Sequence, residues 1–241
     1  MTTRDQKTAF YEATTMGGHT QSPPLMHIAQ SKMVAWESVP GDPVVLDIGS
    51  GAGVGVSHLA TRMSNPHVFC IDLSSPALDE VKRKGLVPLI ASAEGAHLPF
   101  GDTSFDIVVF NEVIEHLVDT DSIMDEIHRV LKPKGLLLLS TPNLASWFNR
   151  GAILLGVQPA FSEVSFRKVY GRPGSGLVGH LRLFTRRALV EFVGDSGFEI
   201  ESVRGIAFPE LPRAVQPIDR ALSRFSSIAG GLVVVASKRD R

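Results

Sequence analysis

Apolar residues along the chain fall into short continuous runs that alternate with segments of helical spacing. The runs predict buried strands, and apolar residues that recur every three to four positions predict helices covering those strands. The predicted strands are 44–48, 67–71, 86–91, 105–110 and 136–140, and the predicted helices between them are 54–63, 76–84 and 121–131. Strands alternating with helices favour a parallel sheet with both faces covered. The pattern therefore predicts an α/β protein.

The alternation breaks after the fifth predicted strand. Residues 142–180 contain three prolines and six glycines, a composition too irregular for a core layer, and predict a lid or insertion. A helix then follows over 185–196, with Gly197 as its C-terminal stop, and two closing strands complete the sheet. These closing strands are predicted at 198–203 and 232–236, with a short helix near 218–225 between them. We expect one domain divided into an N-terminal cap (1–40), a core (41–141), a lid (142–184) and a C-terminal part of the sheet (185–241).

Composition narrows the class of protein. The 241 residues carry 24 Lys and Arg against 25 Asp and Glu, so no basic excess drives binding to nucleic acid or to an anionic membrane, although a local patch stays open. The single cysteine, Cys70, excludes a disulfide framework within the chain and fits a reducing compartment. The printed N-terminus lacks the apolar run of a signal peptide, and no stretch reaches the roughly 20 apolar residues of a membrane helix. The expectation is a cytoplasmic protein without membrane insertion.

The most informative segment joins the first predicted strand to the first helix. Val45 to Gly53 reads VLDIGSGAG, a strand followed by a tight glycine turn of the kind that brings backbone close to a nucleotide-like ligand. A dinucleotide-binding turn needs glycine at its first, third and sixth positions, and Val54 stands at the sixth position counted from Gly49. This argues against a nicotinamide-dependent oxidoreductase. Asp72 follows Gly53 by 19 residues, where an acid can accept hydrogen bonds from a ribose, or can simply cap a helix.

Three later segments complete a family pattern: ASAEGAHLPF at 91–100, SFDIVVFNEVIEHL at 104–117 and RVLKPKG at 129–135. With the glycine turn and Asp72, they resemble the class I S-adenosylmethionine-dependent methyltransferases over roughly residues 40–145. The first segment departs from the family's usual spacing by about one residue, and Lys134 replaces a family glycine.

The resemblance implies a Rossmann-like, doubly wound, mostly parallel seven-stranded sheet with an antiparallel last strand, and S-adenosylmethionine as methyl donor. It places Asp47 near the ammonium end of the methionine moiety, Asp72 at the ribose, and Ala93 and Glu94 at the adenine edge. The implied cofactor-binding residues are Asp47, Gly49, Ser50, Gly51, Gly53, Asp72, Leu73, Ala93, Glu94, Asn111, Glu112 and Val113. The N-terminal segment, with Tyr11 and His19, would fold over this pocket.

Two segments bear on the identity of the methyl acceptor, STPN at 140–143 and GHLRLFT at 179–185. Both are similar to segments of small-molecule O-methyltransferases of the ubiquinone-biosynthesis type. This similarity implies methyl transfer to a hydroxyl oxygen of a small molecule. Catalysis of such a transfer depends on the alignment of the two reactants and on a base that accepts the hydroxyl proton. His180 is the first candidate for that base and His116 the second, while a purely structural role for His180 is an equal alternative. The lid's aromatic residues suit an apolar or ring-bearing acceptor, or pack on the lid or on a second subunit, which leaves a homodimer open.

Several alternatives remain at this stage. Glu112, Glu115 and His116 resemble a metal-linked motif of the ubiquinone branch, but the Glu-His pair is common in the wider family without metal, so we predict none. Binding motifs do not guarantee turnover, so a non-catalytic S-adenosylmethionine-binding regulator or scaffold stays open, as does C- or N-methylation. The near-neutral charge and the lack of an Asn-Pro-Pro-Tyr-type motif disfavour a nucleic-acid or protein acceptor.

Overall fold

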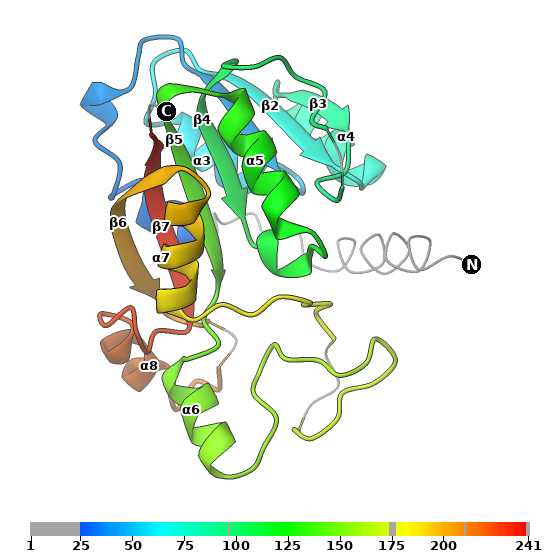
Figure 1. The fold of residues 1–241 in the computed structure, drawn as a ribbon, viewed down its shortest axis with the longest axis vertical. Coiled ribbons are helices and arrows are strands. Elements are labelled where there is room, and N and C mark those ends of the chain that lie inside the picture. The colour runs from blue at the N-terminus through cyan, green and yellow to red at the C-terminus, as the bar shows by residue number, and fades with distance from the viewer. Residues whose placement is uncertain (1–24, 96, 174–176, 210, 240–241) are drawn as a thin grey trace.

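The computed structural model describes residues 25–95, 97–173, 177–209 and 211–239, so Tyr11 and His19 lie outside the described chain. A seven-stranded sheet forms its centre, in the order β3-β2-β1-β4-β5-β7-β6 (Figure 1). The strands are β1 (Val44–Ile48), β2 (His67–Asp72), β3 (Val87–Ile90), β4 (Phe105–Asn111), β5 (Leu131–Pro142), β6 (Phe198–Ile206) and β7 (Gly231–Lys238). The first five are parallel, and β7 is antiparallel to both β5 and β6. The predicted fold class is confirmed.

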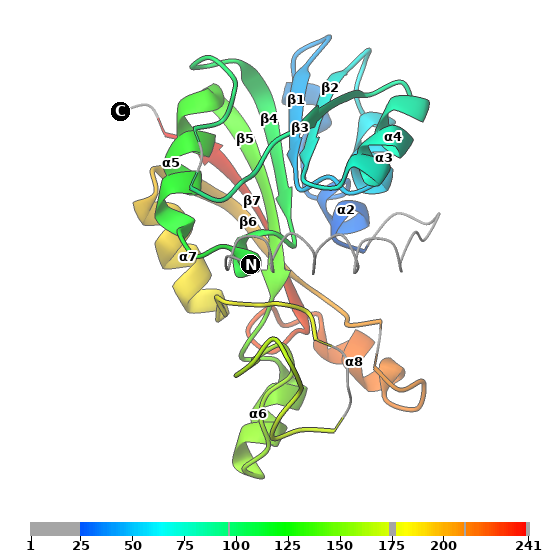
Figure 2. The same cartoon turned by 90° about the vertical axis from the view of Figure 1, so that its right-hand side faces the viewer.

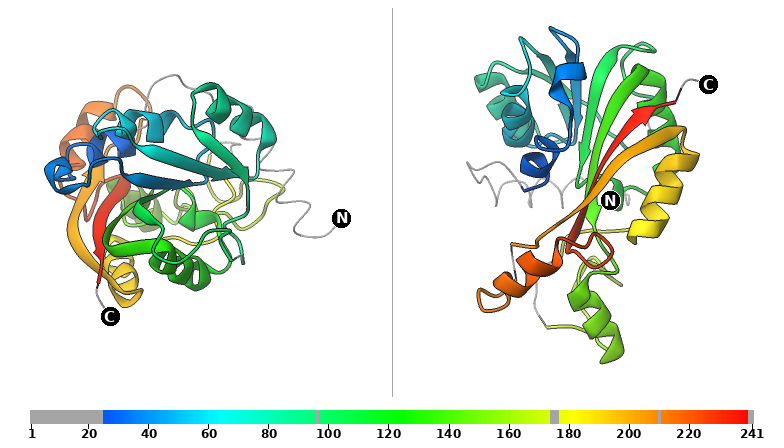
Figure 3. Two further views of the ribbon diagram at one scale, coloured as in Figure 1. Left: turned by 90° about the horizontal axis from the view of Figure 1, so that it is seen from above. Right: turned by 90° about the vertical axis from the view of Figure 1, so that its left-hand side faces the viewer.

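Helices cover both faces of the sheet (Figures 1 and 3). The helices of the core are α3 (Val54–Ala60) and α4 (Ser75–Arg83) on one face, and α5 (Thr120–Val130) and α7 (Arg186–Asp195) on the other. Within β4, Val108 and Phe110 belong to the cluster under α5 and α7, while Ile107 and Val109 belong to the cluster under α3 and α4. Both faces of the strand are therefore apolar, which is why its sequence is a continuous apolar run.

Local signals set the helix ends. The hydroxyl of Ser74 accepts a hydrogen bond from the Ala77 amide at the start of α4, and the hydroxyl of Thr185 accepts one from the Ala188 amide at the start of α7. Gly197 follows α7 with a φ of +92°, a conformation that glycine adopts without strain.

The segment between α5 and the predicted fifth strand differs from expectation. The predicted helix ends at 131 and the predicted strand begins at 136, which leaves KPKG at 132–135 between them, but β5 begins at Leu131, directly after α5. The residues of β5 that pair with β4 change there from Leu131 directly to Leu136, so the regular hydrogen-bond ladder is interrupted between them. Pro133, which has no N–H group to donate, lies in this interruption. Lys134 has a φ of +59°, a left-handed conformation for which glycine is better suited than lysine.

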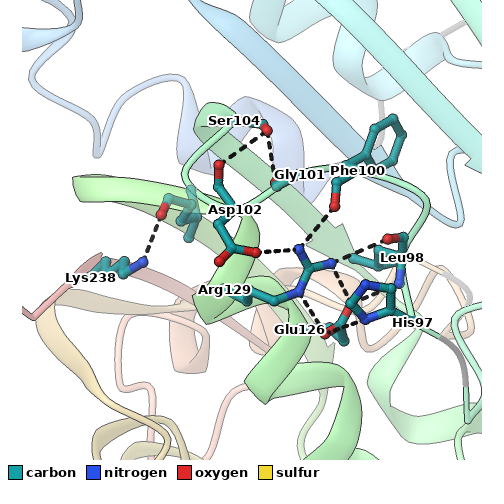
Figure 4. Close-up of polar contacts among 10 residues, drawn as sticks. His97, Leu98, Phe100, Gly101, Asp102, Ser104, Glu126, Arg129 and Lys238 are labelled. Atoms are coloured by element: carbon teal, nitrogen blue, oxygen red, sulfur yellow. Dashed lines mark hydrogen bonds and ion pairs between the residues drawn. The ribbon is translucent and has the colours of Figure 1, made fainter.

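Arg129, at the end of α5, connects this helix by hydrogen bonds to the segment before β4 (Figure 4). Its guanidinium donates to the carboxylates of Glu126 and Asp102 and to the carbonyl oxygens of Leu98 and Phe100. Chiefly because of the hydrogen bonds from Arg129, the pKa of Glu126 is lowered to about 2. The arginine of RVLKPKG therefore has a structural role in this chain.

The remaining elements lie at the edges of the core. They are α2 (Leu25–Gln30), α6 (Trp147–Leu154), α8 (Gln216–Leu222) and two short 3₁₀ turns, η1 (Trp36–Ser38) and η2 (Ile114–His116). The predicted lid contains α6 and extends away from the end of the sheet at which β5 terminates (Figure 2). No helix in the described chain is long and apolar enough to cross a bilayer.

Candidate functional site

The carboxyl ends of three neighbouring strands hold most of the predicted cofactor residues. β1 pairs in parallel with β2 on one side and with β4 on the other, so the chain segments that follow these strands leave the same edge of the sheet. In open α/β sheets, ligands bind at this edge, where the strand order reverses. Here the reversal falls at β1 and β4, between the glycine turn and the loop after β4.

The three glycines of the turn have positive φ angles but different surroundings. A Cβ atom on Gly49 would lie 2.4 Å from a methyl group of Val113, and one on Gly53 would lie 3.2 Å from a methyl group of Val81. A Cβ atom on Gly51, where φ is +51°, would meet no atom of the described chain within 4 Å. Protein packing thus explains Gly49 and Gly53, while the described residues leave space beside Gly51 that a bound ligand could fill.

Asp72 contacts this turn directly. One carboxylate oxygen accepts a hydrogen bond from the Gly51 amide at 2.8 Å, and the other accepts one from the Ser74 amide at 2.8 Å. Asp72 therefore stabilises the turn and precedes the capping residue of α4, which is Ser74. A carboxylate offers about four lone-pair positions, so both oxygens can still accept hydrogen bonds from the hydroxyl groups of a ribose.

Asp47 lies beneath the turn at the end of β1. Its side chain is buried and accepts no hydrogen bond from a described residue. Burial, with repulsion from Asp72 as the second cause, raises the pKa of Asp47 well above its usual range. A cationic group nearby would lower that pKa again, so the carboxyl fits the ammonium end of a methionine moiety.

Asn111, at the end of β4, is bound to α2. Its amide nitrogen donates to Gln30 and contacts His27, while its oxygen accepts from Gln30 at 2.8 Å. His27 in turn fills the space beside Gly55 in α3. Sequence analysis missed His27 and Gln30, since 81 residues separate Gln30 from Asn111 and no pattern connects them.

The loop after β4 reaches the glycine turn on one side. Glu112 has a φ of +55°, a strained conformation for glutamate. Its carboxylate accepts a hydrogen bond from the Ser140 hydroxyl at 2.7 Å, and its amide donates to the Ser140 carbonyl oxygen. This turn directs Val113 back against Gly49.

The same loop contacts the lid on its other side. The carbonyl oxygen of Glu115 accepts hydrogen bonds from the amides of Leu181 and Arg182, and His116 contacts the Gly179 carbonyl oxygen at 3.2 Å through Nδ1. The rings of His116 and His180 are 4.7 Å apart. Both predicted catalytic histidines therefore lie together, at the point where the lid returns to the core.

Glu115 and His180 form a buried acid–base pair. Oε1 of Glu115 lies 3.9 Å from Nε2 of His180, and the other Glu115 oxygen accepts from the Thr141 hydroxyl. Burial lowers the pKa of His180 to about 3, with His116 as a second cause. Burial and the charge of Glu112 raise the pKa of Glu115. At neutral pH the imidazole is therefore neutral, and its burial disfavours the protonated form.

The residues that could bind a metal ion in the structure differ from those of the motif found in the sequence. One ligand atom each from Glu115, His116 and His180 lie within 4.8 Å of one another, so these three could hold a cation. Glu112, which the motif included, directs its carboxylate to Ser140 instead.

The adenine-side candidates lie farther along the same edge. Glu94 accepts hydrogen bonds from the amides of Val118 and Asp119, just before α5. Its carboxylate thus joins the segment after β3 to the start of α5. Leu73, directly after Asp72, is 39% exposed, and Ala93 is partly buried against the core. His97 is exposed and contacts Glu126.

The lid's aromatic residues divide into two groups. Phe161 packs against Phe148, Phe208 and the ring of His180. Phe166 and Tyr170 are instead exposed, by 48% and 53%. Only the first group therefore provides an apolar wall beside the buried acid–base pair.

Known proteins share the core of this chain. Residues 46–139 match the family model described as a methyltransferase domain. A probable S-adenosylmethionine-dependent methyltransferase of Mycolicibacterium smegmatis is 29% identical over 67% of this chain and 54% of its own length. A ubiquinone/menaquinone biosynthesis C-methyltransferase, UbiE, of Bartonella tribocorum is 33% identical over 47% of each protein. The matches thus cover less than two thirds of these relatives.

The fold extends further than the sequence similarity. A structure of an S-adenosylmethionine-dependent methyltransferase from Mesorhizobium loti aligns with a TM-score of 0.59 at 18% identity. The alignment covers 88% of this chain and 96% of that one. The chain thus shares its fold with a solved structure over most of its length.

Proposed function

We propose that this chain is a class I S-adenosylmethionine-dependent methyltransferase that transfers the methyl group of S-adenosylmethionine to a hydroxyl oxygen of a small molecule. The observation that carries the proposal is the loop after β4. It contacts the glycine turn through Val113 and the buried acid–base pair through Glu115 and His116. A cofactor side and a proton-accepting side thus lie at the two ends of one short loop.

The residues present fit the cofactor. Gly51 leaves space for a ligand that approaches the backbone, Asp72 has lone pairs left for ribose hydroxyls, and Asp47 is a buried carboxyl without a hydrogen-bond donor among the described residues. When bound, S-adenosylmethionine supplies an electrophilic methyl group on a sulfonium. The chain's own contribution on this side is binding and orientation.

On the acceptor side, His180 is the group that would accept the hydroxyl proton. It is neutral at pH 7, and an ionised Glu115 beside it would stabilise the imidazolium that forms, against the burial that disfavours charge on both groups. Phe161 and Phe148 form an apolar wall that excludes water and suits an apolar or ring-bearing acceptor. This arrangement favours a hydroxyl over a carbon acceptor, although the chain's similarity to UbiE makes C-methylation the second candidate.

Replacement of Asp72 by alanine tests the cofactor side. We expect S-adenosylhomocysteine binding to weaken by about 1.5–3 kcal/mol, the usual contribution of hydrogen bonds to a charged group. Isothermal titration calorimetry on the folded variant measures this change. The matched control is Asp106→Ala, because Asp106 also accepts a hydrogen bond from a backbone amide, that of Val44, but lies at the start of β4, at the opposite edge of the sheet.

The two variants separate ligand binding from support of the backbone. Asp106→Ala should bind S-adenosylhomocysteine like the parent. If Asp72→Ala also binds like the parent while folded, Asp72 only stabilises the turn and its proposed contact with ribose is wrong. An equal loss in both variants would show that the effect is one of general stability.

A further inference from the structure

The end of the lid exposes an unusual amount of aliphatic surface. Ile153, Leu154 and Leu155 follow one another at the C-terminal end of α6 and are 56%, 86% and 80% exposed. Val164 and Tyr170, in the loop that follows, are also exposed. Single exposed apolar residues are normal on a protein surface, but consecutive ones at a projecting end mark an interaction site. We call these five residues the lid tip.

The lid tip belongs to a segment that is internally hydrogen-bonded. The Asn149 side chain in α6 accepts a hydrogen bond from the Ala160 amide and donates one to the Ala160 carbonyl oxygen. The amide of Gln158 donates to the carbonyl oxygen of Gly171, farther along the loop. Both bridges join α6 and its following turn to the rest of the lid, so the aliphatic side chains are held outward.

The exposed charge around the lid tip has one sign. Arg167 and Lys168, between Val164 and Tyr170 in the sequence, are exposed, whereas the guanidinium of Arg150 donates to the carbonyl oxygens of Ala145 and Ser227. Glu163 is the only acid between residues 143 and 182 of the sequence. Its carboxylate accepts hydrogen bonds from the amides of Val178 and Gly179, and its side chain is only 3% exposed. The lid therefore carries both exposed cations and exposed aliphatic side chains, although the whole chain has a formal net charge of −1.

We infer that the lid tip docks on an anionic lipid surface, with Leu154 and Leu155 in the interface and the lid's cations among the headgroups. Aliphatic side chains flanked by Lys and Arg are the combination by which proteins lie on such a surface without spanning it. A second copy of the chain fits less well, because a two-fold contact through this surface would bring the same cations face to face. RNA also fits less well, because the two most exposed side chains of the lid tip, Leu154 and Leu155, offer no ring on which bases stack.

The position of the lid tip gives this contact a direction. The lid follows the carboxyl end of β5, so α6 lies beyond the sheet edge that carries the glycine turn and His180 (Figures 1 and 2). Docking would therefore turn the acceptor side of the protein, and not the opposite edge, toward the lipid.

The test is sedimentation of the whole protein with vesicles of phosphatidylcholine and phosphatidylglycerol. We expect the protein to bind, and the double variant L154Q/L155Q to lower the partition coefficient at least about tenfold, since two exposed leucines leave the interface. R167E/K168E should lower it by about tenfold or more, as should vesicles of phosphatidylcholine alone. Circular dichroism and unchanged affinity for S-adenosylhomocysteine show that each variant is folded.

The matched control is K82E/K84E. Lys82 and Lys84 are exposed cations as well, but they lie before β3 at the opposite edge of the sheet, so this variant should bind vesicles like the parent. Three results would overturn the inference: no binding to anionic vesicles, an equal loss in the control, or binding that L154Q/L155Q leaves unchanged. A dimer in vesicle-free solution that L154Q/L155Q dissociates would also overturn it, by assigning the surface to a second copy. RNA binding that needs Arg167 and Lys168 but not the leucines would assign it to nucleic acid.

Discussion

Replacement of Gly51 by valine is expected to lower the affinity for S-adenosylmethionine by about 100-fold or more. The valine side chain would enter the space beside the turn, where the described chain places no atom within 4 Å of the new Cβ. Overfilling a close-fitting site costs about 1–3 kcal/mol, and each 1.4 kcal/mol is a factor of ten in affinity. A β-branched residue also resists the φ of +51° that the turn requires, which displaces the amide bonded to Asp72. Calorimetric titration with S-adenosylhomocysteine measures the loss.

Gly85→Val is the matched control for this substitution. Gly85 also has a positive φ, +76°, and a Cβ atom there would likewise meet no described atom within 4 Å, but it lies between α4 and β3 at the opposite edge of the sheet. Backbone strain alone should therefore destabilise both variants, while only Gly51→Val should lose the ligand. If both variants bind S-adenosylhomocysteine like the parent, the open space at Gly51 is not the cofactor site.

His180→Ala is expected to lower kcat by about 100-fold or more and to leave the affinity for S-adenosylhomocysteine unchanged. A general base contributes about 10²- to 10⁴-fold to a rate, and His180 contacts Glu115, His116 and Phe161, not the glycine turn. The assay requires an acceptor, found by screening phenolic, hydroxy-acid and sugar-linked compounds for methyl transfer.

The control for this substitution is His128→Ala. His128 is also buried and also packs edge-on against an aromatic ring, that of Phe198, but it lies in α5, away from the lid. It should keep turnover within about threefold of the parent at a temperature where the protein is folded. A loss below about threefold in His180→Ala would remove this residue from the mechanism, and His116 would be the next candidate. A collapse of cofactor affinity would instead make His180 a structural contact of the lid.

Much of the fold could be predicted because its local signals agree with its packing. β4 is apolar on both faces, and Ser74, Thr185 and Gly197 bound helices as their chemistry favours. The start of β5 could not be predicted, because Lys132 to Gly135 contain a proline and a turn-forming pattern. They are accommodated only because the pairing with β4 is irregular there.

The candidate site likewise combines contacts that the sequence predicts with contacts that it does not. The glycine turn and Asp72 are close in the fold through one strand–turn–helix unit, so their spacing in the sequence was informative. The contacts of Asn111 with α2 and of Glu115 with the lid join residues far apart along the chain, and no local pattern predicts them. The net charge of the whole chain was also a poor guide to the lid, because residues 142–184 contain only one acid, Glu163.

The central claim is that the glycine turn binds S-adenosylmethionine, and calorimetry on the unmodified protein tests it most directly. Separate titrations with S-adenosylmethionine, S-adenosylhomocysteine and NAD use the same protein and buffer. We expect saturable binding of the first two at one site per chain and no measurable binding of NAD, because Val54 stands where a dinucleotide turn requires glycine. Tight binding of NAD, with no heat from either S-adenosyl compound, would contradict the account.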